Sequence, residues 1–306
     1  MCNARNNCLV TVIGIFGPTA SGKSPVAAAV AERLPAELVS ADALQVYRGL
    51  PILTNQASEP TRLVGIWPLD HEASVGEYAP LAHAAIDEIL ASGRTPVVIG
   101  GTGLYLRAAL AELALPPRPG AGARARWERF HDEAGPAAAH ARLAELDPAA
   151  AAAVHPNDRR RVVRALELAE VGSSLVPDDD RLWARETRHP TLIVGLDVAK
   201  DALERRIEAR SRAMFDAGVQ KEVRVALRGE ISHTARRALG LEAIASLPRE
   251  QALAELVVRT RRYAAYQRKW MRRVPGIVMV DADRPPGEIA DDIVALARTR
   301  ERLRRR

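Results

Sequence analysis

The sequence of 306 residues has little of several features that mark particular classes of protein. Its two cysteines, Cys2 and Cys8, have no histidine or cysteine cluster beside them, which argues against a disulfide framework or a zinc site and favours a reducing compartment. No window of about 18 apolar residues occurs, so no membrane-spanning helix is expected. The N-terminus has no apolar segment that ends in a cleavage site, so the sequence predicts a cytoplasmic protein without a secretory signal.

Lysine is also scarce, because only four of the 44 basic residues are lysines. Enrichment in arginine and alanine is typical of a GC-rich genome and accounts for the overall bias. It does not account for the positions of the charges. Residues 256–280 contain seven basic residues and no acidic one, within a chain of net charge +6. Such a cluster is typical of a surface that binds a polyanion.

Short β-branched apolar runs alternate with helical patterns, which predicts a parallel α/β sheet with helices on both faces. The region after residue 115 is different, because a Pro/Gly-rich linker leads into an alanine-rich, strand-free segment. We therefore expect a core of residues 1–115 and 190–306, interrupted by an all-helical insertion over residues 116–189. The expected strands are residues 9–16, 36–40, 96–99, 192–196 and 277–280, and the clearest helices are 25–34, 81–91 and a basic one at 249–273.

The segment GPTASGKS, residues 17–24, lies between the first expected strand and the first expected helix. It matches the phosphate-binding loop (P-loop) pattern G-x-x-x-x-G-K-[ST] in the context that this pattern requires. Glycines allow backbone N–H groups to surround phosphate oxygens at a helix N-terminus, and Lys23 adds a positive charge. The Ser24 hydroxyl is a candidate ligand of Mg²⁺. The motif indicates a phosphoanhydride ligand without specifying ATP.

Two further polar residues follow expected strands and therefore lie at the same edge of the sheet as the P-loop. Asp42 comes directly after the second strand, and Thr102 lies in the Gly-Gly-Thr-Gly segment after the third. Asp42 can also be a helix cap, and Thr102 a turn hydroxyl. Asp197 is a weaker candidate acid. We expect Asp42, Thr102 and the P-loop to share one crevice.

Arginines and aromatic residues in the helical segments have simpler interpretations that compete with a binding role. Residues 159–161 are all arginine, and a second group lies at 205–212; each group is compatible with a solvated surface. Tyr263, Tyr266 and Trp270 recur at helical spacing in the basic helix. That spacing favours a role for these aromatic residues as the core-facing side of the helix.

Taken together, five segments resemble the tRNA dimethylallyltransferase family, in order and over almost the whole chain. They are GPTASGKS, SADALQVYRGL at 40–50, the GGTGLYLR segment from 100, HPND followed by RRRVVRALEL at 155–168, and residues 261–270. The resemblance implies transfer of a dimethylallyl group from dimethylallyl diphosphate to N6 of adenosine 37 in tRNA. It also implies a P-loop core, Mg²⁺ as cofactor, an insertion that grips the anticodon arm and, with one site in one chain, a monomer without a membrane.

The resemblance also assigns residue roles. Asp42 is implied as the general base, Thr102 as the residue that supports the leaving diphosphate, and Arg210 as a further catalytic residue. The implied diphosphate-binding residues are Gly17, Pro18, Thr19, Ala20, Ser21, Gly22, Lys23 and Ser24, with Ser24 also the metal ligand. The implied tRNA-binding residues are Asp42, Ala43, Leu44, Gln45, Thr102, Arg124, Asp158, Arg159, Arg160, Arg161 and Val162.

The sequence departs from the family pattern at several positions, and these departures keep alternatives open. Pro25 follows Ser24 where a backbone N–H is usual, and Asp70-His71 replaces a pair of histidines. Gln56 and Ala265 stand where the family often has lysine, and Leu241 where it has an aromatic residue. The alternatives are a P-loop kinase, an enzyme that prenylates free adenine nucleotides, and a catalytically weak RNA-binding homologue.

Overall fold

The computed structural model describes residues 12–56, 59–117, 119–120, 122–176 and 181–304. Cys2, Cys8 and the start of the first expected strand lie outside these residues. The chain divides into two compact units, which we call the core unit (residues 1–112 and 185–306) and the helical unit (residues 113–184). No helix of the described residues is both long enough and apolar enough to cross a membrane.

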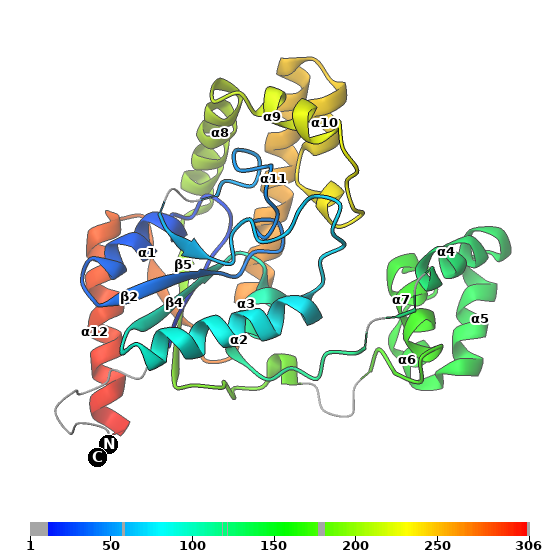
Figure 1. Cartoon of the computed structure of the whole chain (residues 1–306), viewed down its shortest axis with the longest axis horizontal. Coiled ribbons are helices and arrows are strands. Elements are labelled where there is room, and N and C mark those ends of the chain that lie inside the picture. Colours follow the sequence, from blue (N-terminus) through cyan, green and yellow to red (C-terminus); the bar gives the residue numbers. More distant parts are fainter. Residues whose placement is uncertain (1–11, 57–58, 118, 121, 177–180, 305–306) are drawn as a thin grey trace. The chain divides into compact units, whose positions relative to one another are not determined.

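A six-stranded parallel sheet forms the centre of the core unit, in the order β3-β2-β4-β1-β5-β6 (Figure 1). Its four central strands are almost entirely buried, as expected for a parallel sheet that is covered on both faces. The carboxyl ends of all strands meet at one edge, so the loops after β1, β2 and β4 emerge together. The strands are β1 (Val12–Phe16), β2 (Ala36–Ser40), β3 (Thr61–Arg62), β4 (Thr95–Gly100), β5 (Thr191–Asp197) and β6 (Val278–Asp281).

Alternate residues of the strands point into two different apolar layers. Ile13 and Val194 face a layer built with α1 (Lys23–Ala31) and α12 (Pro286–Arg304). Val12 and Ile193 face the opposite layer, built with α2 (Val75–Ala91) and α3 (Gly103–Leu110). This two-sided burial confirms the predicted architecture of a parallel sheet between helical layers.

Four further helices of the core unit pack on one another beside the first layer (Figure 1). The long helix α11 contacts α8 and α10, and α10 contacts α9. Their buried faces belong to the same apolar cluster as α1 and α12. The four helices are α8 (Lys200–Asp216), α9 (Val219–Ala226), α10 (Leu241–Ser246) and α11 (Arg249–Met271).

The described residues of the helical unit contain helices and no strand, and they enclose their own small core. Leu143, Val162 and Leu166 are completely buried in it. Residues 185–189, which the sequence placed in the insertion, belong to the core unit instead, where His189 Nε2 lies 2.7 Å from Asp87 Oδ1. The helices are α4 (Ala123–Ala134), α5 (Pro136–Leu146), α6 (Pro148–Ala153) and α7 (Arg159–Ala169), and a 3₁₀ turn, η1 (Arg181–Trp183), follows them.

The prediction that the aromatic residues of α11 form its core-facing side is wrong for Tyr266, whereas Trp270 packs, partly buried, against the layer built with α2 and α3. The buried side of α11 includes Leu253, Leu256, Ala264 and Met271. Tyr266 is 55% exposed, because the register of the small and aliphatic residues, rather than that of the aromatic ones, faces the core.

Candidate active site

The P-loop joins β1 to α1 through backbone conformations that suit a phosphate-binding loop. Ala20 (φ 64°) and Gly22 (φ 91°) are left-handed, and Ser21 N donates to Pro18 O at 3.1 Å. A Cβ atom at Gly17 would lie 2.6 Å from Ser21 Oγ, so a side chain at position 17 would force the loop to shift. The loop therefore turns tightly into the N-terminus of α1, where N–H groups and the helix dipole favour an anion.

A cavity of about 360 Å³ opens beside the P-loop within the core unit. One part of its wall is polar and charged, and another part is apolar. The polar lining includes Thr19, Lys23, Ser24, Asp42, Gln45, Arg206, Arg210, Tyr263 and Gln267, and the apolar lining includes Leu44, Leu53, Met214, Leu239 and Leu256. A ligand with a charged head and an apolar chain therefore matches both parts of the wall.

Of the three cations in the cavity lining, Lys23, Arg206 and Arg210, the first and the last contact the P-loop. Lys23 Nζ donates to Gly17 O at 2.9 Å and to Pro18 O at 2.8 Å. Burial lowers the pKa of Lys23 to about 8, and the Arg210 charge acts in the same direction against the opposing effect of Asp42. Arg210 Nη2 donates to Thr19 Oγ1 at 2.5 Å, while its Nε is buried without a partner in the described part of the chain. The site thus holds positive charge that an anionic ligand would stabilise.

Asp42 is half-buried and lines the same cavity at the carboxyl end of β2. Its Oδ1 accepts from Leu44 N at 3.0 Å, while no described residue donates to its Oδ2. The strands β2 and β4 approach closely here, because a Cβ at Gly100 would lie 2.2 Å from Ala41 O. The carboxylate is therefore fixed through one oxygen and retains the other for a ligand. Asp197, the weaker candidate acid, lies outside the cavity lining and pairs with Arg268.

Thr102 lies beside the cavity rather than in its lining and connects Asp42's loop with α11. Its Oγ1 accepts from Ala43 N at 3.3 Å. Tyr263, in the cavity wall, lies close to the side chains of Thr102 and Gln267. Burial, together with the Asp42 charge, raises the pKa of the Tyr263 hydroxyl to about 12, so this hydroxyl remains protonated near neutral pH and can donate.

Gln267 is a site residue that sequence reasoning did not select. Its side chain is nearly buried, accepts from Thr19 N at 2.8 Å and donates to Gly101 O at 2.7 Å. One amide therefore joins the P-loop, the Gly-Gly-Thr-Gly loop and α11. The glycines permit this contact, because a Cβ at Gly101 would lie 2.4 Å from Gln267 Nε2 and one at Gly103 would lie 2.2 Å from Trp270. The sequence offered one signal for this contact, because the Gly-Gly-Thr-Gly segment and residues 261–270 both belong to the segments that resemble the family.

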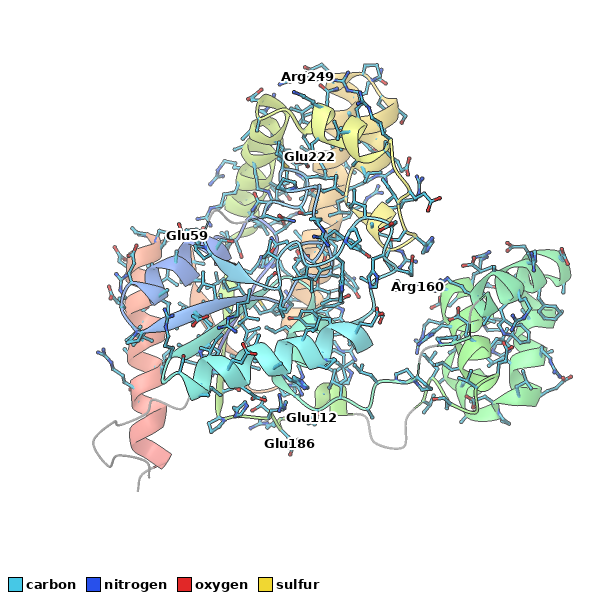
Figure 2. All side chains as sticks on the ribbon, viewed as in Figure 1. Glu59, Glu112, Arg160, Glu186, Glu222 and Arg249 are labelled. Atoms are coloured by element: carbon cyan, nitrogen blue, oxygen red, sulfur yellow. The ribbon has the colours of Figure 1, made fainter. Side chains whose placement is uncertain are left out.

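Gln45 and Glu222 bind the backbone of the segment 52–55, which contributes another part of the cavity wall. Gln45 Nε2 donates to Asn55 O at 3.0 Å, and Gln45 Oε1 accepts from Ser40 Oγ at 2.9 Å. Glu222, on α9, accepts from Ile52 N and Leu53 N, each at 2.8 Å (Figure 2). Burial raises the pKa of Glu222, although the two backbone hydrogen bonds oppose that shift. Both side chains therefore support the backbone around the cavity.

The remaining departures from the family pattern have structural roles or are exposed. Gln56 Nε2 donates to Tyr47 O at 2.7 Å, which fixes the loop after β2. Leu241 is completely buried in the core, and Ala265 is exposed on α11. His71 stacks on Trp67 with ring centroids 5.0 Å apart. None of these substitutions interrupts the groups that line the cavity.

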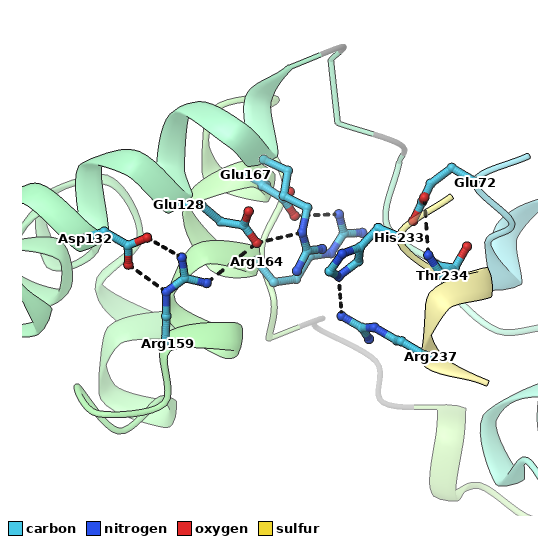
Figure 3. Close-up of polar contacts among 10 residues, drawn as sticks. Glu72, Glu128, Asp132, Arg159, Arg164, Glu167, His233, Thr234 and Arg237 are labelled. Carbon is cyan, nitrogen blue, oxygen red and sulfur yellow. Dashed lines mark hydrogen bonds and ion pairs between the residues drawn. The ribbon is translucent and has the colours of Figure 1, made fainter. Parts of the chain in front are cut away.

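In the helical unit, the residues that the resemblance assigned to tRNA divide into engaged and free groups, and Figure 3 shows the ion pairs of Arg159, which is one of the engaged residues. Asp158 caps α7 by accepting from Arg161 N at 3.1 Å, and Val162 is buried in the unit's core. Arg124 pairs with Glu128 at 3.1 Å, and Arg159 with Asp132 at 2.7 Å. Two exposed side chains on α7, Arg160 (labelled in Figure 2) and Arg161, pair with no acid among the described residues. Those two are the cations that α7 leaves free for a polyanion.

The sequence profile of the IPP transferase family matches residues 45–274. The chain belongs to the IPP transferase family. A relative from Thermobifida fusca named tRNA dimethylallyltransferase is 40% identical over 307 aligned residues, which cover 94% of each chain. The matched region of the IPP transferase profile contains every residue of the cavity lining except those of the P-loop, Pro25 and the loop start at Asp42 and Leu44.

Solved structures of similar proteins agree with the fold. The tRNA isopentenylpyrophosphate transferase of Bacillus halodurans superimposes with a TM-score of 0.69 and 30% identity, covering 97% of this chain and all of that one. A eukaryotic dimethylallyltransferase acting on tRNA gives a TM-score of 0.74 at 22% identity, covering 94% and 80% of the two chains. At 22% identity, the likeness to the eukaryotic structure supports only the fold of this IPP transferase family member.

Proposed function

We propose that this protein transfers a dimethylallyl group from dimethylallyl diphosphate to N6 of adenosine 37 in tRNA. The observation that carries the proposal is one cavity in which the half-free carboxylate of Asp42 faces the P-loop, Lys23 and Arg210. A carboxylate base for proton removal and cations for a diphosphate are the two requirements of this reaction. The names of similar proteins support the same substrates.

The donor binds with its diphosphate against the P-loop and its allylic chain against the apolar wall. Backbone N–H groups at the start of α1, the Lys23 ammonium and the Arg210 guanidinium stabilise the diphosphate charge. That charge grows as the carbon–oxygen bond breaks, so these groups stabilise the transition state more than the bound donor. The Arg210 Nε is buried without a partner among the described residues, and a bound diphosphate oxygen gives it a hydrogen-bond acceptor.

Asp42 accepts the proton that the amine loses. As the C1–O bond to the diphosphate breaks, the N6 lone pair forms a bond to C1, and a proton from N6 passes to the free oxygen of Asp42. Diphosphate leaves with the electron pair of the broken bond. Thr102 and the protonated Tyr263 hydroxyl lie next to Asp42's loop and orient the groups at that point.

The oxygen donors present are suited to Mg²⁺. Ser24 lines the cavity beside Lys23, and Asp42 supplies a carboxylate across it. Within the described residues no group of three or more His, Cys, Asp or Glu side chains forms a metal cage. This arrangement matches Mg²⁺, which commonly takes one or two protein ligands together with phosphate oxygens and water. When bound, the ion would neutralise diphosphate charge, with Ser24 as its protein ligand.

The other candidate functions receive less support. A P-loop kinase does not need Asp42 beside an apolar chain site, and a prenyltransferase for free adenine nucleotides does not use exposed cations on α7. A catalytically weak homologue would have lost cavity groups, whereas the Asp42, Lys23 and Arg210 side chains all line one cavity. We further propose a cytoplasmic monomer, since the described residues of one chain build the whole cavity.

The direct test is incubation of the purified protein with Mg²⁺, dimethylallyl diphosphate and an unmodified tRNA that carries adenosine 37, followed by mass spectrometry of the nucleosides. We expect one dimethylallyl group on that adenosine and none on a tRNA with guanosine there. Parallel reactions with AMP or ATP should give no product. Modification of AMP but not of tRNA would overturn the proposal.

Arg160→Ala should weaken tRNA binding and its dependence on salt. The exposed Arg160 has no acidic partner in the described structure, so loss of one phosphate contact should lower the slope of log Kd against log salt concentration by about one. Arg124→Ala should have a smaller effect, because Glu128 already neutralises that charge. Arg142→Ala, which removes another paired arginine, is the control. An unchanged slope for Arg160→Ala would identify a solvated surface residue.

Pro25→Ala should bind the donor more tightly. Pro25 lies in the first turn of α1 and lines the cavity but has no N–H to donate to a phosphate. A hydrogen bond to a charged group contributes roughly 1.5–3 kcal/mol, so we expect about a 10- to 100-fold lower donor Kd by titration calorimetry. Pro136→Ala, at the start of α5, is the control. Equal or weaker binding with an intact thermal melt would mean that another group serves that oxygen.

A further inference from the structure

One face of α11 exposes an aromatic ring between two cations. Tyr266 is 55% exposed, which makes it the most exposed of the large apolar side chains in the described structure. Arg262 and Lys269 precede and follow it by four and three residues, so the three side chains share one helical face. Both are exposed, and neither pairs with an acid among the described residues.

Other basic residues of α11 differ in this respect. Arg259 is bound to Glu255 at 2.6 Å, and Arg268 to Asp197 at 3.3 Å. The cations beside Tyr266 are therefore available to an external anion. An exposed ring on its own is ordinary, whereas a ring flanked by unpaired cations matches the alternation of base and phosphate along a nucleic acid strand.

Tyr266 is also connected to the active-site cavity. Its ring stacks on that of Tyr263, with centroids 6.3 Å apart and an interplanar angle of 24°. Tyr263 lines the cavity and lies close to the side chain of Thr102. The two rings thus extend from the wall of the cavity, where the target adenine enters, to the exposed surface of α11.

We propose that Tyr266 is a stacking platform for the nucleobase adjacent to the target adenosine, with Arg262 and Lys269 binding the phosphates on either side. This inference rests on the proposed function. A base that leaves its stack to enter an active site deprives its neighbour of a stacking partner, and an aromatic side chain can replace that partner. Arg262 and Lys269 are about 10 Å apart along the helix axis, at 1.5 Å per residue, so the ring lies between two phosphate-binding points.

Tyr266→Ala should raise the KM for tRNA about 5- to 100-fold, the range expected for loss of one base–aromatic stack. The KM for dimethylallyl diphosphate should not change, because Tyr266 does not line the cavity. The salt dependence of tRNA binding should also be unchanged, since the ring carries no charge, whereas Arg262→Ala and Lys269→Ala should each lower the log–log slope by about one. Tyr266→Phe should retain the KM for tRNA.

The decisive experiment combines the protein variant with a modified RNA. Anticodon stem-loops are prepared with an abasic nucleotide on the 5′ or the 3′ side of the target adenosine. With one of these two abasic RNAs, the KM of the wild-type protein should rise to the value that Tyr266→Ala shows on intact RNA. The KM of Tyr266→Ala should not rise further on that abasic RNA. Val258→Ala, which trims another exposed side chain of α11, is the matched control and should behave as wild type on every RNA.

Three results would overturn the proposal: independent losses from Tyr266→Ala and from both abasic RNAs, an unchanged KM for tRNA in Tyr266→Ala, or a raised KM for the donor in that variant. The wild-type reaction on the intact stem-loop is measured first. Absence of transfer there contradicts the proposed function rather than the role of Tyr266. A loss in Tyr266→Phe equal to that in Tyr266→Ala would identify the hydroxyl, not the ring face, as the contact.

Discussion

Asp42→Asn should abolish prenyl transfer while tRNA binding stays close to that of the wild type. The amide keeps an oxygen that can accept from Leu44 N, so the loop after β2 should keep its conformation. It cannot take up the proton of the amine, and a general base typically contributes about 10²–10⁴-fold to the rate. Single-turnover transfer of labelled dimethylallyl to tRNA measures the loss, and filter binding measures tRNA affinity.

Asp197→Asn is the matched control for this experiment. Asp197 is also an acid at the carboxyl edge of the sheet, but it pairs with Arg268 and does not line the cavity. It should retain nearly full turnover. An Asp42→Asn variant that keeps more than about a tenth of wild-type turnover would contradict the assignment of Asp42 as the general base.

Lys23→Ala should raise the Kd for dimethylallyl diphosphate by about 10- to 100-fold, the loss of one charged hydrogen bond. The charge state of Lys23 adds a pH dependence. Its pKa of about 8 means that the free protein carries this positive charge below pH 8 and loses it above. Bound diphosphate favours the charged form and raises that pKa, so binding above pH 8 takes up a proton.

The wild-type Kd for the donor should therefore rise by up to about tenfold per pH unit above pH 8, where the phosphates of the donor, with a last pKa near 6, are already ionised. Calorimetry in buffers of different ionisation enthalpy should register uptake of one proton at pH 9. Lys23→Arg stays charged and should bind with no such dependence. Donor binding that does not change between pH 7 and 9.5 in the wild type would contradict this account of Lys23.

The sequence predicted the central strands closely and placed Asp42 at the same sheet edge as the P-loop, because both predictions depend on local patterns. The buried strand Ala36–Ser40 agrees to the residue. The start of α2 was predicted wrongly, at residue 81 instead of Val75, and the part that was missed contains Gly76 and Pro80, which are poor helix formers. The helix begins at Val75 because the Ser74 side chain caps it: Ser74 Oγ accepts from Glu77 N at 3.3 Å and donates to the Glu77 carboxylate at 3.1 Å.

Other features depend on contacts between distant segments and left no local signal. The strand β3 has two residues and exists through its pairing with β2. Helix α12 was not predicted as a helix, although it packs along α1. Val162 belongs to a segment that resembles the family and was assigned to tRNA, yet its side chain is buried in the core of the helical unit. Sequence patterns identified the loops of the site, whereas tertiary packing determined which residues within them are available to a substrate.

The Gln267 amide also determines when the active site can exist during synthesis. It joins Thr19 near the beginning of the chain to Gly101 and lies in the last long helix before β6. A nascent chain that ends before residue 267 can pair its central strands but lacks the partner that holds the P-loop N–H of Thr19. Competence to bind the donor should therefore arise late in translation, and fragments released early should fold their sheet without becoming active.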